Sequence, residues 1–280
     1  MSLAACVEEN TQQLDGGEDQ QKKDPNKAQM LKLNNQLFSI PSPIQSAKLF
    51  QELNLPYNND NLHSADALGN YATSSKKGLN LGVYGADLGY VSLYAQEKDA
   101  TELLGAINKL VNDLDLTAAI DENLVNRFIK NMNNSDSLVY IVSDFYDAGD
   151  SYLKENDRSD IAGLVLAGGW IEGMYLTTTN AGSNEKVIAR ISEQKSVIGN
   201  LIKILEQTPD NAEAQGLIED LVQLENIYDK IDYEYVYVRP ETMPDKRRTK
   251  IKSRTEFSMS DDVLNEIKNT VESLRNKIIS

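Results

Sequence analysis

Hydrophobic residues recur every three or four positions along most of the chain, the spacing of one face of an α-helix. The helices that this pattern predicts cover 76–114 with a break near 97–100, 121–132, 135–152, 161–178, 184–207, 211–231 and 261–278. Ser159 or Asp160 is the expected cap of the helix over 161–178, and Ser260 that of the last helix. The short join at 208–210 favours an antiparallel pair of helices.

Two regions depart from helical spacing. Residues 233–238 have tyrosine at every second position and are rich in residues that favour strands, and residues 249–257 alternate as well, so we expect a two-stranded ribbon over 233–257. Residues 57–75 are rich in Asn and Ser and predict a loop with one helical turn at 65–68. The fold class expected is therefore all-α, a helical bundle with a small β-ribbon before the C-terminal helix.

The first 32 residues contain almost nothing to bury. They are dominated by Glu, Gln, Asp, Asn, Lys and Gly, a composition typical of a flexible tether. Leu37, Phe38 and Ile40 then lead into Pro41-Ser42-Pro43, which predicts a short helix ending near Leu53. We therefore expect a tether over 1–32 and one helical domain over 33–280.

Four glycines in the first long helix lie on one face, at spacings of four, three and four: Gly78, Gly82, Gly85 and Gly89. Each costs about 0.5–1 kcal/mol relative to alanine inside a helix, so a compensating contact is required. The expected partner is the helix over 161–176, whose small residues Ala162, Gly169 and Gly173 also share a face. Both helices are apolar nearly all round, which indicates a central position.

Each of these two helices carries one acid in an apolar body, Asp87 in the first and Glu172 in the second. A buried carboxylate is costly unless it is paired or hydrogen-bonded. One interpretation is a polar pocket for a cationic or hydroxylated ligand, formed by these acids together with Asn80, Tyr84, Tyr90, Tyr94, Trp170 and Tyr175. The alternative is that neighbouring side chains or backbone groups satisfy the acids, which then only fix the helix register.

Composition excludes several classes of function. The formal charge of −15 disfavours general nucleic-acid binding, and a single cysteine excludes sites built from several thiolates. The one histidine, His63, lies in a predicted loop without the Glu-x-x-His pairs of di-iron bundles. No hydrolase or phosphate-loop motif is present. We therefore expect no enzyme, metal or cofactor.

The N-terminal Leu3-Ala4-Ala5-Cys6 resembles the lipobox of bacterial lipoproteins, in which the cysteine thiol is acylated. The resemblance implies a lipid anchor on Cys6 and a location in the cell envelope, facing the periplasm or the cell surface. Glu8-Glu9 is similar to the export signal of surface lipoproteins in some Gram-negative bacteria, which implies the outer membrane. The alternative is that Cys6 is an incidental thiol in a polar tail.

A basic run near the C-terminus stands out in this acidic chain, with six Lys or Arg among nine residues: Lys246, Arg247, Arg248, Lys250, Lys252 and Arg254. The run either contacts an anionic surface or pairs with the acidic helices of the same chain. Taken together, the sequence predicts a non-enzymatic lipoprotein that binds another envelope protein or a glycan. The second hypothesis is a small-molecule sensor or carrier built around Asp87 and Glu172.

Overall fold

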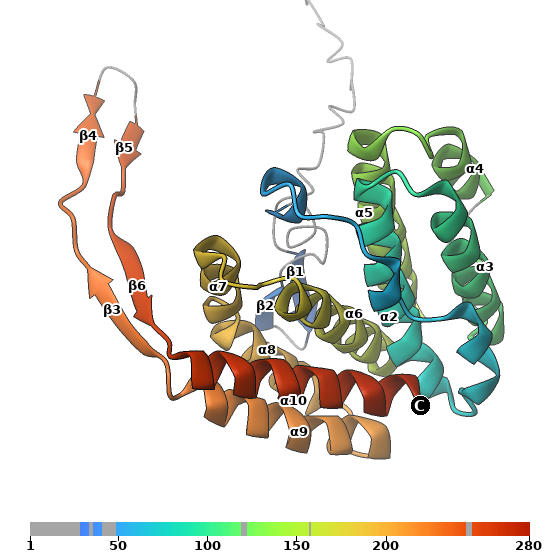
Figure 1. The fold of residues 1–280 in the computed structure, drawn as a ribbon. Helices are drawn as coiled ribbons and strands as arrows, with labels where there is room; N and C mark the ends of the chain where they lie inside the picture. The colour runs from blue at the N-terminus through green and yellow to red at the C-terminus, as the bar shows by residue number, and fades with distance from the viewer. Residues whose placement is uncertain (1–28, 34–35, 41–48, 119–121, 157, 245–247) are drawn as a thin grey trace, which may run out of the picture.

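The computed structural model describes residues 29–33, 36–40, 49–118, 122–156, 158–244 and 248–280. Two central helices, α2 (Ser74–Leu93) and α6 (Ser159–Thr179), lie along one another. One flank is formed by α3 (Glu97–Asp113), α4 (Glu122–Lys130) and α5 (Ser135–Glu155). The other flank is formed by α7 (Glu185–Ser192), α8 (Lys195–Leu205), α9 (Ala212–Tyr228) and α10 (Asp261–Ile279) (Figure 1). The predicted helical bundle is confirmed.

The backbones of α2 and α6 meet at glycines. A Cβ atom on Gly82 would lie 2.1 Å from the carbonyl oxygen of Val165 and 2.6 Å from the amide nitrogen of Gly169. A Cβ atom on Gly168 would lie 2.0 Å from the carbonyl oxygen of Leu79. No real side chain fits at these distances, so the predicted close approach is confirmed. Gly168, which the sequence analysis did not single out, is as critical as Gly82.

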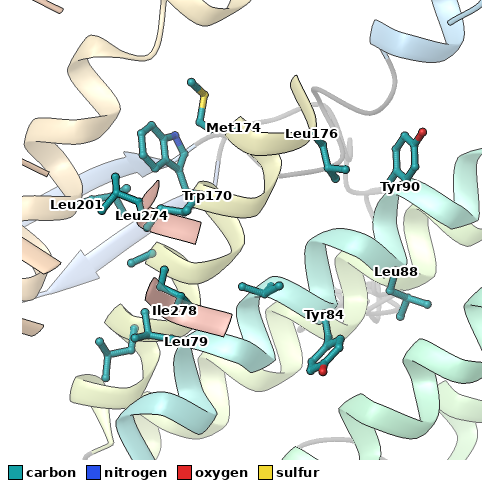
Figure 2. Packing of buried hydrophobic residues seen from close by; sticks show 14 of the residues in the cluster. Leu79, Tyr84, Leu88, Tyr90, Trp170, Met174, Leu176, Leu201, Leu274 and Ile278 are labelled. Atoms are coloured by element: carbon teal, nitrogen blue, oxygen red, sulfur yellow. The ribbon is translucent and has the colours of Figure 1, made fainter. Parts of the chain in front are cut away.

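The hydrophobic core surrounds this crossing. Buried side chains of α2 and α6 pack with residues from the outer helices, including Leu201 of α8 and Leu274 and Ile278 of α10 (Figure 2). The apolar stripe of α10 was predicted from its spacing, and its buried residues Ile267, Val271 and Leu274 confirm that this helix docks on the bundle. The two central helices have apolar residues all round because neighbours cover every side.

The predicted cap of the last helix is confirmed by a hydrogen bond, and a second cap that was not predicted begins α9. Ser260 caps α10 by accepting from the Val263 amide at 3.3 Å, and Asn211 caps α9 by accepting from the Ala214 amide at 3.0 Å. The predicted turn at 65–68 belongs to a 3₁₀ helix over Ala65–Asn70, η2, which a shorter one over Asn59–Asn61, η1, precedes.

Other boundaries were predicted wrongly. The expected helix over 184–207 is two helices, α7 and α8, separated at 193–194. The break is stabilised by the buried Gln194 side chain, which accepts from Trp170 Nε1 at 3.2 Å and donates to the Arg190 carbonyl at 3.0 Å. Ser159 and Asp160 do not cap α6 but lie inside its first turn, and no side chain caps that end. The break between α2 and α3 falls at 94–96, where Ala95 has φ = 50°.

The predicted ribbon forms an arm that leaves the body between α9 and α10. Strand β3 (Asp232–Val236) pairs with β6 (Arg254–Ser258), and β4 (Glu241–Met243) pairs with β5 (Arg248–Lys250), all antiparallel. The arm extends well beyond the ends of α9 and α10 (Figure 1). The ribbon was therefore predicted correctly, but its projection was not.

A second hairpin lies near the N-terminus and was not predicted. Strands β1 (Gln29–Leu33) and β2 (Gln36–Ile40) pair antiparallel. Regular structure thus begins at Gln29, inside the range assigned to the tether, whereas residues 1–28 with Cys6 lie outside the described residues. The predicted helix ending near Leu53 is described only over 49–52, which are helical. Among the described residues, no helix has the length and apolar character needed to cross a membrane.

The glycine crossing yields a stability prediction. We expect Gly82→Ala to lower the free energy of unfolding by about 3 kcal/mol or more, because the new methyl group forces the two backbones apart. Gly216→Ala is the matched control, since a Cβ atom at this position of α9 meets nothing within 4 Å. This control should be neutral or stabilising by up to about 1 kcal/mol. Urea unfolding of both variants measures the difference, and equal stabilities would contradict the close crossing.

Candidate functional site

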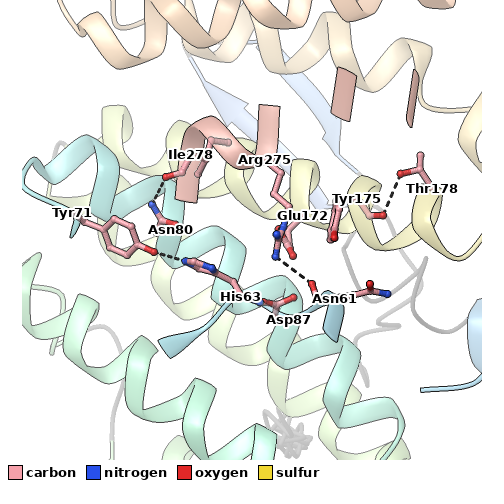
Figure 3. A network of polar contacts seen from close by, with 10 residues as sticks. All are labelled: Asn61, His63, Tyr71, Asn80, Asp87, Glu172, Tyr175, Thr178, Arg275 and Ile278. Atoms are coloured by element: carbon pink, nitrogen blue, oxygen red, sulfur yellow. Dashed lines mark hydrogen bonds and ion pairs between the residues drawn. The ribbon is translucent and has the colours of Figure 1, made fainter. Parts of the chain in front are cut away.

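Polar side chains gather inside the bundle where α2, α6, α10 and the segment between η1 and η2 converge (Figure 3). We call this group the buried polar cluster. Its members are Asn61, His63, Tyr71, Tyr84, Asp87, Glu172, Tyr175 and Arg275. The two acids singled out in the sequence, Asp87 and Glu172, therefore come together across the crossing of α2 and α6, and neither side chain is exposed at all.

Glu172 is held by an arginine from the last helix. Arg275 Nε donates to Glu172 Oε2 at 2.8 Å, and Arg275 Nη2 donates to the Asn61 carbonyl at 3.2 Å. The guanidinium group also lies over the ring of Tyr175, 4.2 Å from its centroid. Charge and hydrogen bonding from Glu172 outweigh the effect of burial and raise the pKa of Arg275. The guanidinium group of this buried ion pair is therefore held by a carboxylate, a backbone carbonyl and an aromatic ring.

Arg275 was missed by the sequence analysis, although a signal was present. It follows Val271 by four positions and Ile267 by eight, so helical spacing places it on the buried face of α10. An arginine within such an apolar stripe predicts a buried anionic partner, because an unpaired buried charge is costly. The identity of that partner depends on how α10 packs, which the spacing does not specify.

Asp87 lies beside Glu172 in the same buried cluster. One oxygen of Asp87, Oδ2, accepts from the backbone N–H of His63 at 2.9 Å. The other two oxygens, Asp87 Oδ1 and Glu172 Oε1, are buried without a hydrogen-bond partner in the described part of the chain, and the two carboxyl groups interact with each other. Burial, and then the charge of Glu172, raise the pKa of Asp87 well above its usual value. We conclude that Asp87 is protonated and donates to a Glu172 carboxylate, which leaves the ion pair without net charge.

The single histidine belongs to the same cluster. The His63 ring stacks on Tyr84 at a centroid distance of 4.9 Å, and its Nε2 hydrogen-bonds the Tyr71 hydroxyl group. Tyr84 in turn donates to the Ser64 carbonyl at 2.8 Å. Burial, and then the positive charge of Arg275, lower the pKa of His63 to about 4. The sequence placed His63 correctly in a loop, but only the tertiary structure shows that this loop is packed over α2.

The remaining predicted pocket residues lie elsewhere. Asn80 Nδ2 donates to the Ile278 carbonyl at 2.9 Å and so joins α2 to the end of α10 (Figure 3). Trp170 lies on the other side of α6, beside Leu201 and Leu274 (Figure 2), where its indole N–H bonds Gln194. Neither side chain adds to the group around Asp87.

Two predicted tyrosines stabilise the segment that precedes η1. Tyr90 accepts from the Asn58 amide at 3.0 Å, and Tyr94 donates to the Leu55 carbonyl at 2.9 Å. Both rings lie against Tyr57, with centroid distances of 5.5 and 5.4 Å. Of the predicted ligand-binding set, Tyr84, Asp87, Glu172 and Tyr175 are therefore brought together, while Asn80, Tyr90, Tyr94 and Trp170 make separate structural contacts.

Three grooves in the described part of the chain lie away from the acids. Grooves of about 970, 500 and 330 Å³ are lined by described residues, and none of the three touches Asp87 or Glu172. The largest lies at the base of the arm, between the α7–α8 end of the bundle and Tyr233, Thr255 and Phe257. In the part of the chain that the structure describes, no three His, Cys, Asp or Glu side chains gather in a way that would hold a metal ion.

The basic run lies on the arm. Lys246 and Arg247 fall outside the described residues, and Arg248 and Lys250 are exposed. Lys252 pairs with Glu241 at 2.5 Å and Arg254 pairs with Glu256 at 2.6 Å. Partial self-pairing was one of the two alternatives, but these partners lie on the arm itself and not on the acidic helices.

The assignment of charge within the cluster predicts a small effect on stability for one substitution and a large loss for another. Asp87→Asn should change the free energy of unfolding by less than about 1 kcal/mol, because an amide keeps the bond from His63 N–H and donates to Glu172 as the protonated acid does. Arg275→Met should destabilise by about 3–5 kcal/mol, because it leaves a buried carboxylate without a cation. Denaturant unfolding at neutral pH measures both. A large loss for Asp87→Asn would contradict the protonated state of Asp87.

The loss in Arg275→Met should shrink in acid. Burial raises the pKa of Glu172, so the folded variant accepts a proton more readily than the unfolded chain as the pH falls. Repeating the unfolding in mildly acidic buffer tests this. A loss that does not depend on pH would point to packing alone.

Because the chain has one histidine, proton NMR reports on it without assignment. We expect the Cε1–H signal of folded protein to titrate near pH 4, and that of urea-unfolded protein near its ordinary value of 6.5. A lowered folded pKa means that the unfolded chain binds more protons between these values. The stability contributed by His63 is therefore complete above about pH 6.5 and decreases as the pH falls toward 4. A folded-state titration near 6.5 would contradict the buried environment.

Comparison with known proteins gives no relative: no family model, no curated protein and no solved structure matches this chain. The function must therefore be argued from the sequence and from the geometry described above.

Proposed function

We propose that this protein is a non-enzymatic binding or interaction module of the cell envelope, and that the β-arm is its contacting element. The observation that carries the proposal is the exposure of large apolar side chains on the arm. Tyr235 is 65% exposed, Tyr237 68% and Ile251 73%, the three highest values among the described large hydrophobic residues. Such exposure on a projecting element is typical of a surface that is covered in a complex.

The arm has a fixed base and an unsupported outer part. At the base, the Tyr233 hydroxyl donates to the Ser192 carbonyl at 2.7 Å, Lys195 lies over the Tyr233 ring, and Phe257 packs against the core. Farther out, both strand edges lack a further pairing partner within the described chain. A lone two-stranded ribbon is marginally stable in water, so a binding surface would supply the packing that the outer part lacks.

The location of the module is proposed from the sequence. A lipid on Cys6 of the lipobox-like Leu3-Ala4-Ala5-Cys6, followed by a polar tether, would hold the domain at the periplasmic or the outer face of a membrane. The expected partners are that membrane and another envelope protein or a glycan. We propose no nucleic acid, metal or cofactor as a ligand.

The alternative function, a small-molecule carrier around Asp87 and Glu172, draws no support from the geometry. The guanidinium group of Arg275 already occupies the position that a cationic ligand would take beside Glu172. Asp87 Oδ2 accepts from His63 N–H, and the carboxyl group interacts with the neighbouring Glu172. The alternative interpretation of the two acids, in which they only fix the register of the packed helices, agrees better with these contacts.

Photo-crosslinking in the native host tests the proposal. A photo-reactive amino acid replacing Tyr237 should give a discrete crosslinked adduct, whereas the same replacement at Tyr140, which is 45% exposed on α5, should give none. In the same cells, mass spectrometry should find acylated Cys6. Equal labelling at both positions would remove the arm as the contacting element, and an unmodified Cys6 would remove the anchor but not the module.

A further inference from the structure

Charge is separated between the arm and the body. Residues 239–254 contain seven Lys or Arg against two Asp or Glu, while the other residues contain 21 against 41. The outer arm is thus a cationic segment attached to a strongly anionic body. Among its described residues, Lys252 and Arg254 have acidic partners on the arm, whereas Arg239, Arg248 and Lys250 have no ion-pair partner there.

Projection removes these cations from the field of the body. From Asp232 to Met243 the chain runs outward, and at about 3.3 Å per residue of strand this is on the order of 35 Å. Charges in physiological salt are screened over about 8 Å. Cations this far along the arm can therefore meet an anionic surface without repulsion from the acidic helices.

Apolar and cationic side chains are interleaved on the outer arm. Exposed Ile251 stands between Lys250 and Lys252, and exposed Tyr237 lies two residues before Arg239. At the boundary of a bilayer, tyrosine and aliphatic side chains enter the head-group region while Lys and Arg reach the phosphates. We propose that the outer arm, through Arg239, Arg248, Lys250, Tyr237 and Ile251, docks on an anionic lipid bilayer.

A bilayer fits this surface better than a folded protein does. The register places Tyr235 opposite Thr255 on one face of the ribbon, and Val236 opposite Arg254 on the other. Apolar residues thus occur on both faces, with a basic residue beside Val236, and a rigid partner would need a slot shaped to receive the ribbon. A fluid bilayer surrounds an inserted hairpin from all sides. The inference rests on the proposed function, because a lipid on Cys6 would keep the arm at high local concentration near the membrane.

Vesicle co-sedimentation of the purified, unacylated chain tests the proposal separately from the anchor. We expect binding to vesicles that contain phosphatidylglycerol, weakened by salt, and little binding to phosphatidylcholine alone. Lys250→Glu changes the charge by two and should lower the partition coefficient roughly 20-fold, since each basic residue near an anionic surface contributes about fivefold. Ile251→Ser should also weaken binding, because it removes an inserted aliphatic side chain.

Two substitutions on the body serve as matched controls. Lys98→Glu makes the same charge change on α3, and Ile129→Ser removes an exposed isoleucine from α4, both across the bundle from the arm (Figure 1). These should bind as the wild type does. No binding to anionic vesicles, equal binding to neutral vesicles, or equal effects of arm and body variants would overturn the proposal. Arm-dependent self-association without vesicle binding would overturn it in favour of a protein partner, and would leave the interaction module itself standing.

Discussion

The close contact between α2 and α6 is the constraint on which the rest of the structure depends. Gly82 and Gly168 let each backbone come within reach of the other's carbonyl groups, at a separation where even a methyl group does not fit. This contact compensates for the helix propensity that glycine lacks. It also brings Asp87 and Glu172, one from each helix, into hydrogen-bonding range. The polar cluster is thus a consequence of the glycine crossing.

Within the cluster, charge is balanced by one proton and one arginine. Two carboxyl groups in a dry interior do not both ionise, so Asp87 keeps its proton while Glu172 pairs with Arg275. Arg275 comes from the last helix and also donates to the carbonyl of Asn61, the last residue of η1. One side chain therefore joins α6, α10 and the loop over α2. The desolvation cost of these groups makes them sensitive to substitution, and their mutual satisfaction gives the bundle a defined register.

The arm differs from the body in the exposure of its apolar side chains and in its charge. The body buries its apolar residues and is acidic, whereas the outer arm exposes tyrosine and isoleucine and is basic. A hairpin inserted between two packed helices is anchored at its base by Tyr233 and Phe257, whereas the outer strands β4 and β5 pair only with each other in the described chain. We therefore expect substitutions at the outer positions to affect binding more than the fold.

The sequence by itself determined the elements and the central pair. Helical spacing, capping residues and the glycine stripe act over a few positions, so the helical bundle, the cap at Ser260 and the meeting of α2 with α6 could all be predicted. Contacts between distant segments could not. The break at Gln194 depends on Trp170, the N-terminal hairpin begins in a segment interpreted as a tether, and His63 and Arg275 reach Asp87 and Glu172 only after folding. Local sequence patterns predict local structure, because they act through neighbouring residues. The group that pairs with a buried charge depends on how distant segments pack, and only the tertiary structure shows which group this is.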